Sequence, residues 1–131
     1  MKILIPGLIL ICVLISQSSA ELFGITIRGK VLCEKKPVEI ELKLHEFDTV
    51  IDDSLDFTIS NSKGEFEVSG NEDEIGELDP FIEISHNCTQ KPGCYQRSRF
   101  YYKTSETNKL LENEVLNLED RKFNFWGPIC D

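Results

Sequence analysis

Basic and aromatic side chains alternate in one short stretch of an otherwise acidic chain. Arg97, Arg99, Tyr101 and Lys103 share one parity. Residues two apart in a β-strand point to the same face, so these four side chains would lie on one face of a sheet. Arginine suits phosphate and carboxylate groups, so they could contact an anion or a lipid headgroup. The alternative, which we favour, is ion pairing with carboxylates on neighbouring strands, such as Glu83.

Cysteines are the second informative set. Four of them, Cys33, Cys88, Cys94 and Cys130, lie beyond the apolar N-terminal segment that contains Cys12. An even number in a small secreted domain predicts two disulfides, whereas the spacing fits zinc poorly, so no metal site is expected. Four cysteines allow three pairings. Strand parity points Cys33 and Cys88 inward, which favours Cys33–Cys88 with Cys94–Cys130 and leaves the other pairings open.

One further motif and two acidic runs bear on modification and metal binding. Asn87 opens an N-glycosylation sequon, Asn-Cys-Thr, and its use is left open. The acidic residues of 48–56 and 72–79 lack the spacing of a calcium loop. We expect them to form solvated edges that keep the protein soluble.

The chain offers little for catalysis. Its two histidines fall on predicted strands, His45 on an outward face and His86 on an inward one. We expect a solvated and a partly buried strand histidine rather than catalytic groups. No Ser-His-Asp or Cys-His arrangement and no Gly-rich phosphate loop can be assembled, so the sequence predicts a protein that is not an enzyme and holds no cofactor.

The N-terminal segment predicts secretion. An almost wholly apolar run, Ile3–Ile15, follows a lysine and precedes small residues at Ser18 and Ala20. This pattern is typical of a signal peptide over residues 1–20, which leaves one domain over residues 21–131. The run is short for a bilayer span, so no transmembrane segment is expected. Signal removal takes one lysine and changes the net charge from −9 to −10, which argues against nucleic-acid partners.

Two alternating apolar runs organise the fold that must position these residues. The first comprises Ile25, Ile27, Val31 and Cys33, and the second Val38, Ile40, Leu42 and Leu44. Period-2 alternation predicts strands with one dry face. Two such strands cannot bury their apolar faces alone, so the rest of the chain is expected to supply a second layer.

The remaining chain predicts more short strands. Leu55, Phe57 and Ile59 alternate, and the turn residues 61–64 are expected to join them to 65–68 in a hairpin. Further strands are predicted over 81–86, 96–103, 115–118 and 123–125, the last one ended by Gly127-Pro128. Seven to eight strands with turn signals predict an antiparallel β-sandwich.

The chain resembles the transthyretin-like proteins that are abundant in nematodes. The resemblance covers Phe23 to Cys130 in six ordered segments, among them G-K-V-L-C-E-K-K-P, S-K-G-E-F-E-V-S-G, D-P-F-I-E-I-S-H-N-C and C-Y-Q-R. It implies an all-β, disulfide-stabilised transthyretin-like (prealbumin-type) sandwich in a secreted protein. One branch of that family is known as a bridging protein for exposed phosphatidylserine on dying cells.

The same fold carries 5-hydroxyisourate hydrolase, whose C-terminal tail is missing here because the chain ends in Pro-Ile-Cys-Asp. The resulting hypothesis is a secreted, non-catalytic extracellular binding protein, associated in some cases with the cell surface. Its candidate partners are a lipid, a small hydrophobic molecule or a cell-surface protein. A hydrolase on this scaffold and a purely structural extracellular component remain the alternatives, and the oligomeric state is open.

Overall fold

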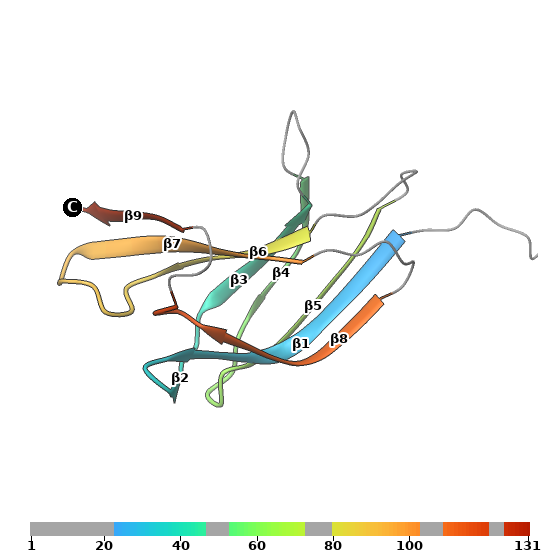
Figure 1. The fold of residues 1–131 in the computed structure, drawn as a ribbon, viewed down its shortest axis with the longest axis horizontal. Helices are drawn as coiled ribbons and strands as arrows, with labels where there is room; N and C mark the ends of the chain where they lie inside the picture. Colours follow the sequence, from blue (N-terminus) through green and yellow to red (C-terminus); the bar gives the residue numbers. More distant parts are fainter. Residues whose placement is uncertain (1–22, 47–52, 73–79, 103–108, 121–124) are drawn as a thin grey trace, which may run out of the picture.

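Two β-sheets enclose the core of the protein. The computed structural model describes residues 23–46, 53–72, 80–102, 109–120 and 125–131, and these contain nine strands and no helix (Figure 1). Consequently no helix in the described ranges is long and apolar enough to cross a membrane. The strands are β1 (Phe23–Cys33), β2 (Lys36–Pro37), β3 (Glu41–Glu46), β4 (Asp53–Ile59), β5 (Glu65–Glu72), β6 (Pro80–His86), β7 (Cys94–Tyr101), β8 (Lys109–Asn117) and β9 (Phe125–Cys130).

The strand order confirms the predicted β-sandwich with two refinements. One sheet has the order β2-β1-β5 with β8 also paired to β1, and the other has the order β4-β3-β6-β7-β9. All pairs run antiparallel except β1 and β8, which run parallel. The strand that the sequence did not predict is the two-residue β2. The predicted signal peptide over residues 1–20 lies outside the described residues and stays a prediction.

The two organising runs lie in different sheets, which corrects our expectation that they form one layer. Ile25 and Ile27 of β1 belong to the four-stranded sheet, whereas Leu42 and Leu44 of β3 belong to the five-stranded sheet, and all four are buried in one core cluster. The two runs therefore bury each other across the sandwich. Alternation alone cannot separate this arrangement from pairing side by side, because both bury the same face.

The strand predicted to begin at Val38 begins later, because the buried Ser60 side chain forms hydrogen bonds with the backbone of Val38 and Ile40. Ser60 Oγ accepts the Ile40 N–H at 2.8 Å and donates to the Val38 carbonyl at 2.6 Å. These bonds satisfy the Ile40 N–H and the Val38 carbonyl outside a strand ladder, and β3 begins at Glu41.

The turn over residues 61–64 is present, but it does not close a hairpin. Asn61 Oδ1 accepts the backbone N–H groups of Lys63 and Glu65, and Gly64 has a φ of 77°. β4 and β5 on either side of it belong to different sheets. The predicted hairpin is therefore wrong, and the turn carries the chain from one layer to the other.

A close backbone approach explains the glycine in the middle of β1. A Cβ at Gly29 would lie 2.1 Å from the Glu114 carbonyl oxygen of β8. At this point the β1–β8 register shifts, and Asn113 adopts a φ of 60°. Only glycine lets the bulged strand pass so close.

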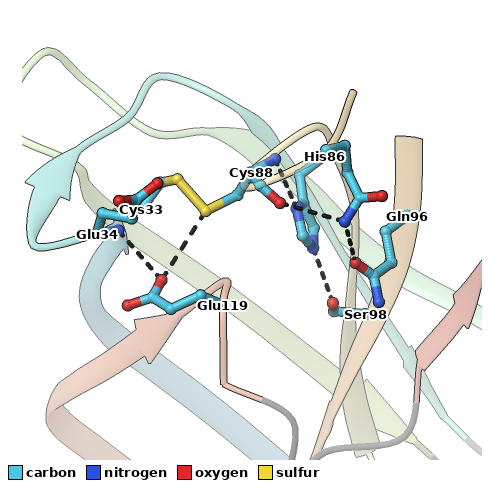
Figure 2. The surroundings of a disulfide bond; sticks show 8 residues. Cys33, Glu34, His86, Cys88, Gln96, Ser98 and Glu119 are labelled. Carbon is cyan, nitrogen blue, oxygen red and sulfur yellow. Dashed lines mark hydrogen bonds between the residues drawn. A yellow bond between two sulfur atoms is a disulfide. The ribbon is translucent and has the colours of Figure 1, made fainter. Parts of the chain in front are cut away.

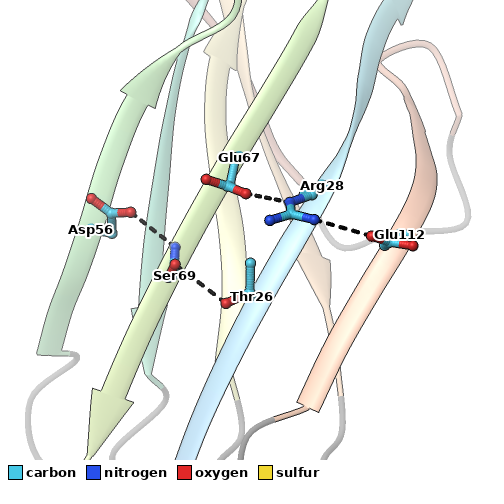
Figure 3. A network of polar contacts seen from close by, with 6 residues as sticks. All are labelled: Thr26, Arg28, Asp56, Glu67, Ser69 and Glu112. Carbon is cyan, nitrogen blue, oxygen red and sulfur yellow. Dashed lines mark hydrogen bonds and ion pairs between the residues drawn. The ribbon is translucent and has the colours of Figure 1, made fainter.

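One carboxylate links the two sheets along the side where β4 passes β5. Asp56 accepts the N–H of its neighbour Phe57 at 2.8 Å with one oxygen. Its other oxygen accepts the N–H of Ser69 at 2.9 Å (Figure 3). Phe57 belongs to β4 and Ser69 to β5, so the two bonds join strands of opposite layers.

Of the two disulfides, one lies at the core and the other at the surface. The structure pairs Cys33 with Cys88 and Cys94 with Cys130, the pairing that strand parity favoured. Cys88 is buried in the core cluster and Cys33 packs against it. Cys130 is exposed at the end of β9.

The last strand continues further than predicted. The sequence placed its end before Gly127-Pro128, but β9 runs through this cis peptide bond to Cys130 and pairs Ile129 with Tyr95 of β7. Figure 1 shows β9 at the outer end of the five-stranded sheet, beside the C-terminus. Pro128 is compatible with pairing here because β9 is an edge strand, and proline is tolerated at sheet edges.

Candidate binding surface on the outer face of the five-stranded sheet

Glutamate and arginine face each other at the centre of the outer face of the five-stranded sheet. Glu83 of β6 lies opposite Arg99 of β7, and Arg99 Nε donates to Glu83 Oε2 at 2.8 Å. Both side chains are largely buried, with exposed fractions of 17% and 15%. Burial by itself lowers the pKa of Arg99, but hydrogen bonds to Tyr101 and Glu83 outweigh it and raise the pKa. Arg99 is therefore a fixed, charged part of the surface.

Aromatic rings hold Arg99 from two sides. Its Cζ lies 4.5 Å from the centroid of the Phe81 ring and 4.6 Å from that of Trp126. Phe81 belongs to β6 and Trp126 to β9, so the guanidinium is stacked between rings from both neighbouring strands. Such cation–π contacts contribute about 0.5–2 kcal/mol each, the larger values applying where the cation is desolvated.

Phe81 is buried without belonging to the core. Its parity is that of Glu83, so it points outward, yet it has no exposed surface. His45 stacks on it with ring centroids 5.3 Å apart, and Tyr101 lies at the same distance on the other side. We did not identify Phe81 or Trp126 as surface-site residues from the sequence. The parity shared by Phe81 and Glu83 was the signal that could have found the first.

Arg97 keeps capacity for a further partner. Its Nε lies 3.7 Å from Glu83 Oε1, which is beyond hydrogen-bond distance, and this buried nitrogen makes no hydrogen bond within the described residues. Arg97, Arg99 and Glu83 together carry one net positive charge. A single anionic group beside Arg97 would balance that charge.

Exposed apolar side chains gather on the same face. In the described part of the chain seven large hydrophobic side chains are exposed, and five of them share the face of this cluster by their strand register. Phe57 is 66% exposed opposite Lys43, and Trp126 is 55% exposed opposite Arg97. The other three are Ile59, Tyr101 and Ile129. Concentrated exposed aromatic and arginine side chains are typical of binding surfaces.

The predicted basic stripe is therefore only partly present. Arg97, Arg99 and Tyr101 share one face, as strand parity predicted. Arg99 forms an ion pair with Glu83, which agrees with the ion-pairing alternative that we favoured. Lys103 lies outside the described residues.

The two histidines lie on opposite faces of the five-stranded sheet. His45 stacks on Phe81 outside, and His86 is buried inside with Nε2 2.8 Å from Ser98 Oγ (Figure 2). The Cys88 N–H donates to His86 Nδ1 at 3.2 Å, so in the neutral ring the proton sits on Nε2. Burial lowers the pKa of His86, and the weaker influence of Glu119 opposes this shift. The histidines cannot act on one substrate together.

A groove of about 950 Å³ lies on the outer face of the four-stranded sheet. Three of its lining residues form an ion-pair ladder, which Figure 3 shows. Arg28 of β1 pairs there with Glu67 of β5 and, at 3.1 Å, with Glu112 of β8. All three side chains are about half exposed. No group of three potential metal ligands occurs among the described residues.

The predicted glycosylation site lies at the surface. Asn87 is exposed directly after β6, where its carbonyl accepts the Gln90 N–H at 3.0 Å in a turn.

Comparison with known proteins identifies the family. The profile described as the transthyretin-like family matches residues 28–101, from the middle of β1 to the end of β7, which include most of the outer-face cluster. The chain belongs to the transthyretin-like family. No solved structure matches it.

Several curated relatives support this transthyretin-like assignment. Transthyretin-like protein 5 of Caenorhabditis elegans is 37% identical over 111 residues, which cover 78% of each chain. Transthyretin-like protein 16 of the same organism is 34% identical over 99 residues, covering 70% of this chain and 75% of the relative. Transthyretin-like protein 46 is 32% identical over 107 residues, covering 73% of this chain and 60% of the relative.

Proposed function

We propose that this transthyretin-like protein is a secreted, non-catalytic binding protein that uses the outer face of its five-stranded sheet to contact an anionic phospholipid headgroup. One observation carries the proposal. Arg97, whose side chain is 35% exposed, lies beside an exposed Trp126 on the face where exposed apolar side chains gather. Tryptophan and tyrosine are favoured at membrane interfaces, and arginine binds phosphate.

The balance of charges sets the range of such binding. The whole chain is acidic, so an anionic membrane repels it at a distance. The excess positive charge around Arg97 acts only locally, because the Debye length at physiological ionic strength is about 8 Å. Recognition therefore has to come from direct contact rather than from long-range attraction.

Secretion rests on two features of the sequence. Residues 1–20 have the pattern of a signal peptide, and the two disulfides suit an oxidising compartment. Asn87 is proposed as a glycosylation site, because its sequon lies in an exposed turn. A hydrolase is the less favoured alternative, since His45 and His86 lie on opposite faces of a sheet.

The single tryptophan makes the proposal testable. Trp126 is the chain's one tryptophan, so its emission reports on the outer face alone. The secreted protein is mixed with phosphatidylserine–phosphatidylcholine vesicles and with phosphatidylcholine vesicles, and emission and co-flotation are measured. We expect a blue shift and flotation only with phosphatidylserine, because the indole leaves water.

A matched pair of variants locates the contact. Arg97→Gln should abolish flotation with little change in melting temperature, whereas Arg28→Gln, which removes an arginine from the opposite face, should leave it intact. The absence of binding by the parent protein at low salt, with or without calcium, would refute the headgroup proposal. If Arg97→Gln and Arg28→Gln reduce flotation equally, the proposed location of the contact on the five-stranded sheet is refuted.

A further inference from the structure

We propose that Cys94–Cys130 is a thiol-accessible disulfide that fastens β9 to the sheet, and that its reduction by a low-molecular-weight thiol releases Trp126 from Arg99. The release itself is independent of the proposed function. Only its effect on ligand binding rests on that function.

The described side chains of strand β9 lie at the surface. Its side chains from Trp126 to Cys130 are all exposed, and none of them belongs to the core cluster. β9 pairs with β7 alone, at the edge of the sheet. Among the described residues, the stack of Trp126 on Arg99, the disulfide near the C-terminus and the hydrogen bond from the Asp131 N–H to the Gly93 carbonyl at 3.0 Å also hold this end of the chain. Because β9 pairs with one strand only and its described side chains lie outside the core cluster, its opening free energy should be low, so we infer that the disulfide determines whether β9 stays in place.

A pocket gives small molecules access to this disulfide. It has a volume of about 410 Å³, and both Cys94 and Cys130 line it. The other lining side chains are polar, apart from Pro128, and include Gln90, Gln96 and Lys91. Lysine beside a cysteine favours the thiolate, which is the better leaving group in disulfide exchange.

The other disulfide is protected by its surroundings. Cys88 is only 5% exposed, and a carboxylate oxygen of Glu119 lies 3.9 Å from its sulfur (Figure 2). The same oxygen accepts the Glu34 N–H at 3.2 Å, which fixes the carboxylate there. An attacking thiolate is negative, so the charge of Glu119 repels it, whereas Lys91 in the other pocket attracts it. Exposed disulfides are the labile ones.

The exchange balances as two successive displacements. A thiolate attacks the exposed Cys130 sulfur and forms a mixed disulfide, and Cys94 leaves as a thiolate that takes up a proton. A second thiolate attacks the external sulfur of the mixed disulfide and releases the Cys130 thiolate, which is also protonated. Two external thiols are thereby oxidised to one disulfide, and the protein disulfide gains two electrons.

Release of β9 changes the proposed binding surface. Trp126 leaves the face of Arg99, so the guanidinium loses one of its two stacked rings while Phe81 and Glu83 keep it in place. The exposed indole beside Arg97 is lost from the surface. Reduction therefore removes the contact that Trp126 would make with a ligand, while the positive charges of Arg97 and Arg99 stay on the surface.

The test uses reduced glutathione as the probe on the folded, secreted protein. Thiols are trapped by alkylation at intervals and located by peptide mass, while Trp126 emission is recorded in the same samples. We expect Cys94 and Cys130 to be alkylated at least about tenfold faster than Cys33 and Cys88. The emission should shift to the red at the rate of the Cys94–Cys130 reduction, and the far-ultraviolet circular dichroism should stay close to native.

Two variants sharpen the result. Lys91→Gln should slow the reduction about threefold without changing the oxidised emission. Cys94→Ser/Cys130→Ser should show the red-shifted emission without added thiol and no response to glutathione. Equal reduction rates for the two disulfides, or an unchanged emission once Cys94–Cys130 is open, would overturn the proposal.

Vesicle flotation separates this proposal from the binding function. If the oxidised protein fails to float but the emission still follows reduction, the headgroup proposal fails and the β9 fastening stands. If the oxidised and reduced proteins float equally, reduction does not regulate the site.

Discussion

Breaking the Glu83–Arg99 pair should cost more than breaking an ion pair on the opposite sheet. The Glu83 and Arg99 side chains are 17% and 15% exposed, whereas Arg28 and Glu67 are each 52% exposed. Exposed pairs contribute at most about 1 kcal/mol, and removing one partner of a buried pair costs about 3–5 kcal/mol. We therefore expect a coupling free energy of about 2 kcal/mol for Glu83–Arg99, between these two limits.

A double-mutant cycle measures this coupling. The free energy of unfolding is obtained in urea, followed by circular dichroism, for the parent, Glu83→Gln, Arg99→Met and the double variant. Arg97 is constant in all four proteins. The single variant Glu83→Gln should lower the melting temperature by roughly 8 °C, because 1 kcal/mol corresponds to about 4 °C at this domain size.

The matched control is the cycle of Arg28→Met and Glu67→Gln, with an expected coupling below about 0.5 kcal/mol. A Glu83–Arg99 coupling no larger than the control would refute the reasoning. It would show that the stacked rings hold Arg99 without help from the carboxylate.

Three further predictions concern the backbone, the pH dependence and the covalent state. Gly29→Ala should destabilise the fold by more than 3 kcal/mol, on the order of a severe core substitution, because the Glu114 carbonyl occupies the methyl position. Gly93→Ala, with φ 82° but open space around it, should cost only about 1 kcal/mol; similar melting points would contradict this. The pKa of His86 is lowered from 6.5, so the unfolded chain binds more protons and stability should fall as the pH drops below 6.5. His86→Gln should flatten that slope in urea titrations at pH 5–8, and an unchanged slope would exclude His86 as the cause. Intact mass should show a chain beginning at Glu21 without free thiols, and Asn87→Gln should remove any glycan mass; four alkylatable thiols in the unreduced protein would contradict the first part.

The sequence predicted the elements better than their assignment to sheets. Ile25, Ile27, Leu42 and Leu44 are buried as their alternation predicted, because period 2 reports which face is dry. It does not report which sheet a strand joins. The turn after β4 shows the same limit, since its residues encode a chain reversal and not the layer of the next strand.

The candidate site shows a related limit. Strand parity placed Arg97, Arg99 and Tyr101 on one face and suggested Glu83 as a partner, because register within a hairpin follows from parity. Trp126 reaches this cluster through β9, which pairs with β7 and continues through Gly127-Pro128, where the sequence placed the end of the strand. No local signal in the sequence carries that information.

The Asp56 carboxylate has a consequence for how recognition can evolve. It uses an N–H of β4 and an N–H of β5 at the seam between the layers, so neither donor is open to an incoming strand. Recognition is thereby directed to side chains on the sheet faces and away from the backbone at this seam. Side chains can be exchanged one at a time without altering the ladder that supports them. The scaffold can thus acquire a different ligand preference through point substitutions at positions such as Phe57, Arg97 and Trp126 while the sandwich beneath them is unchanged.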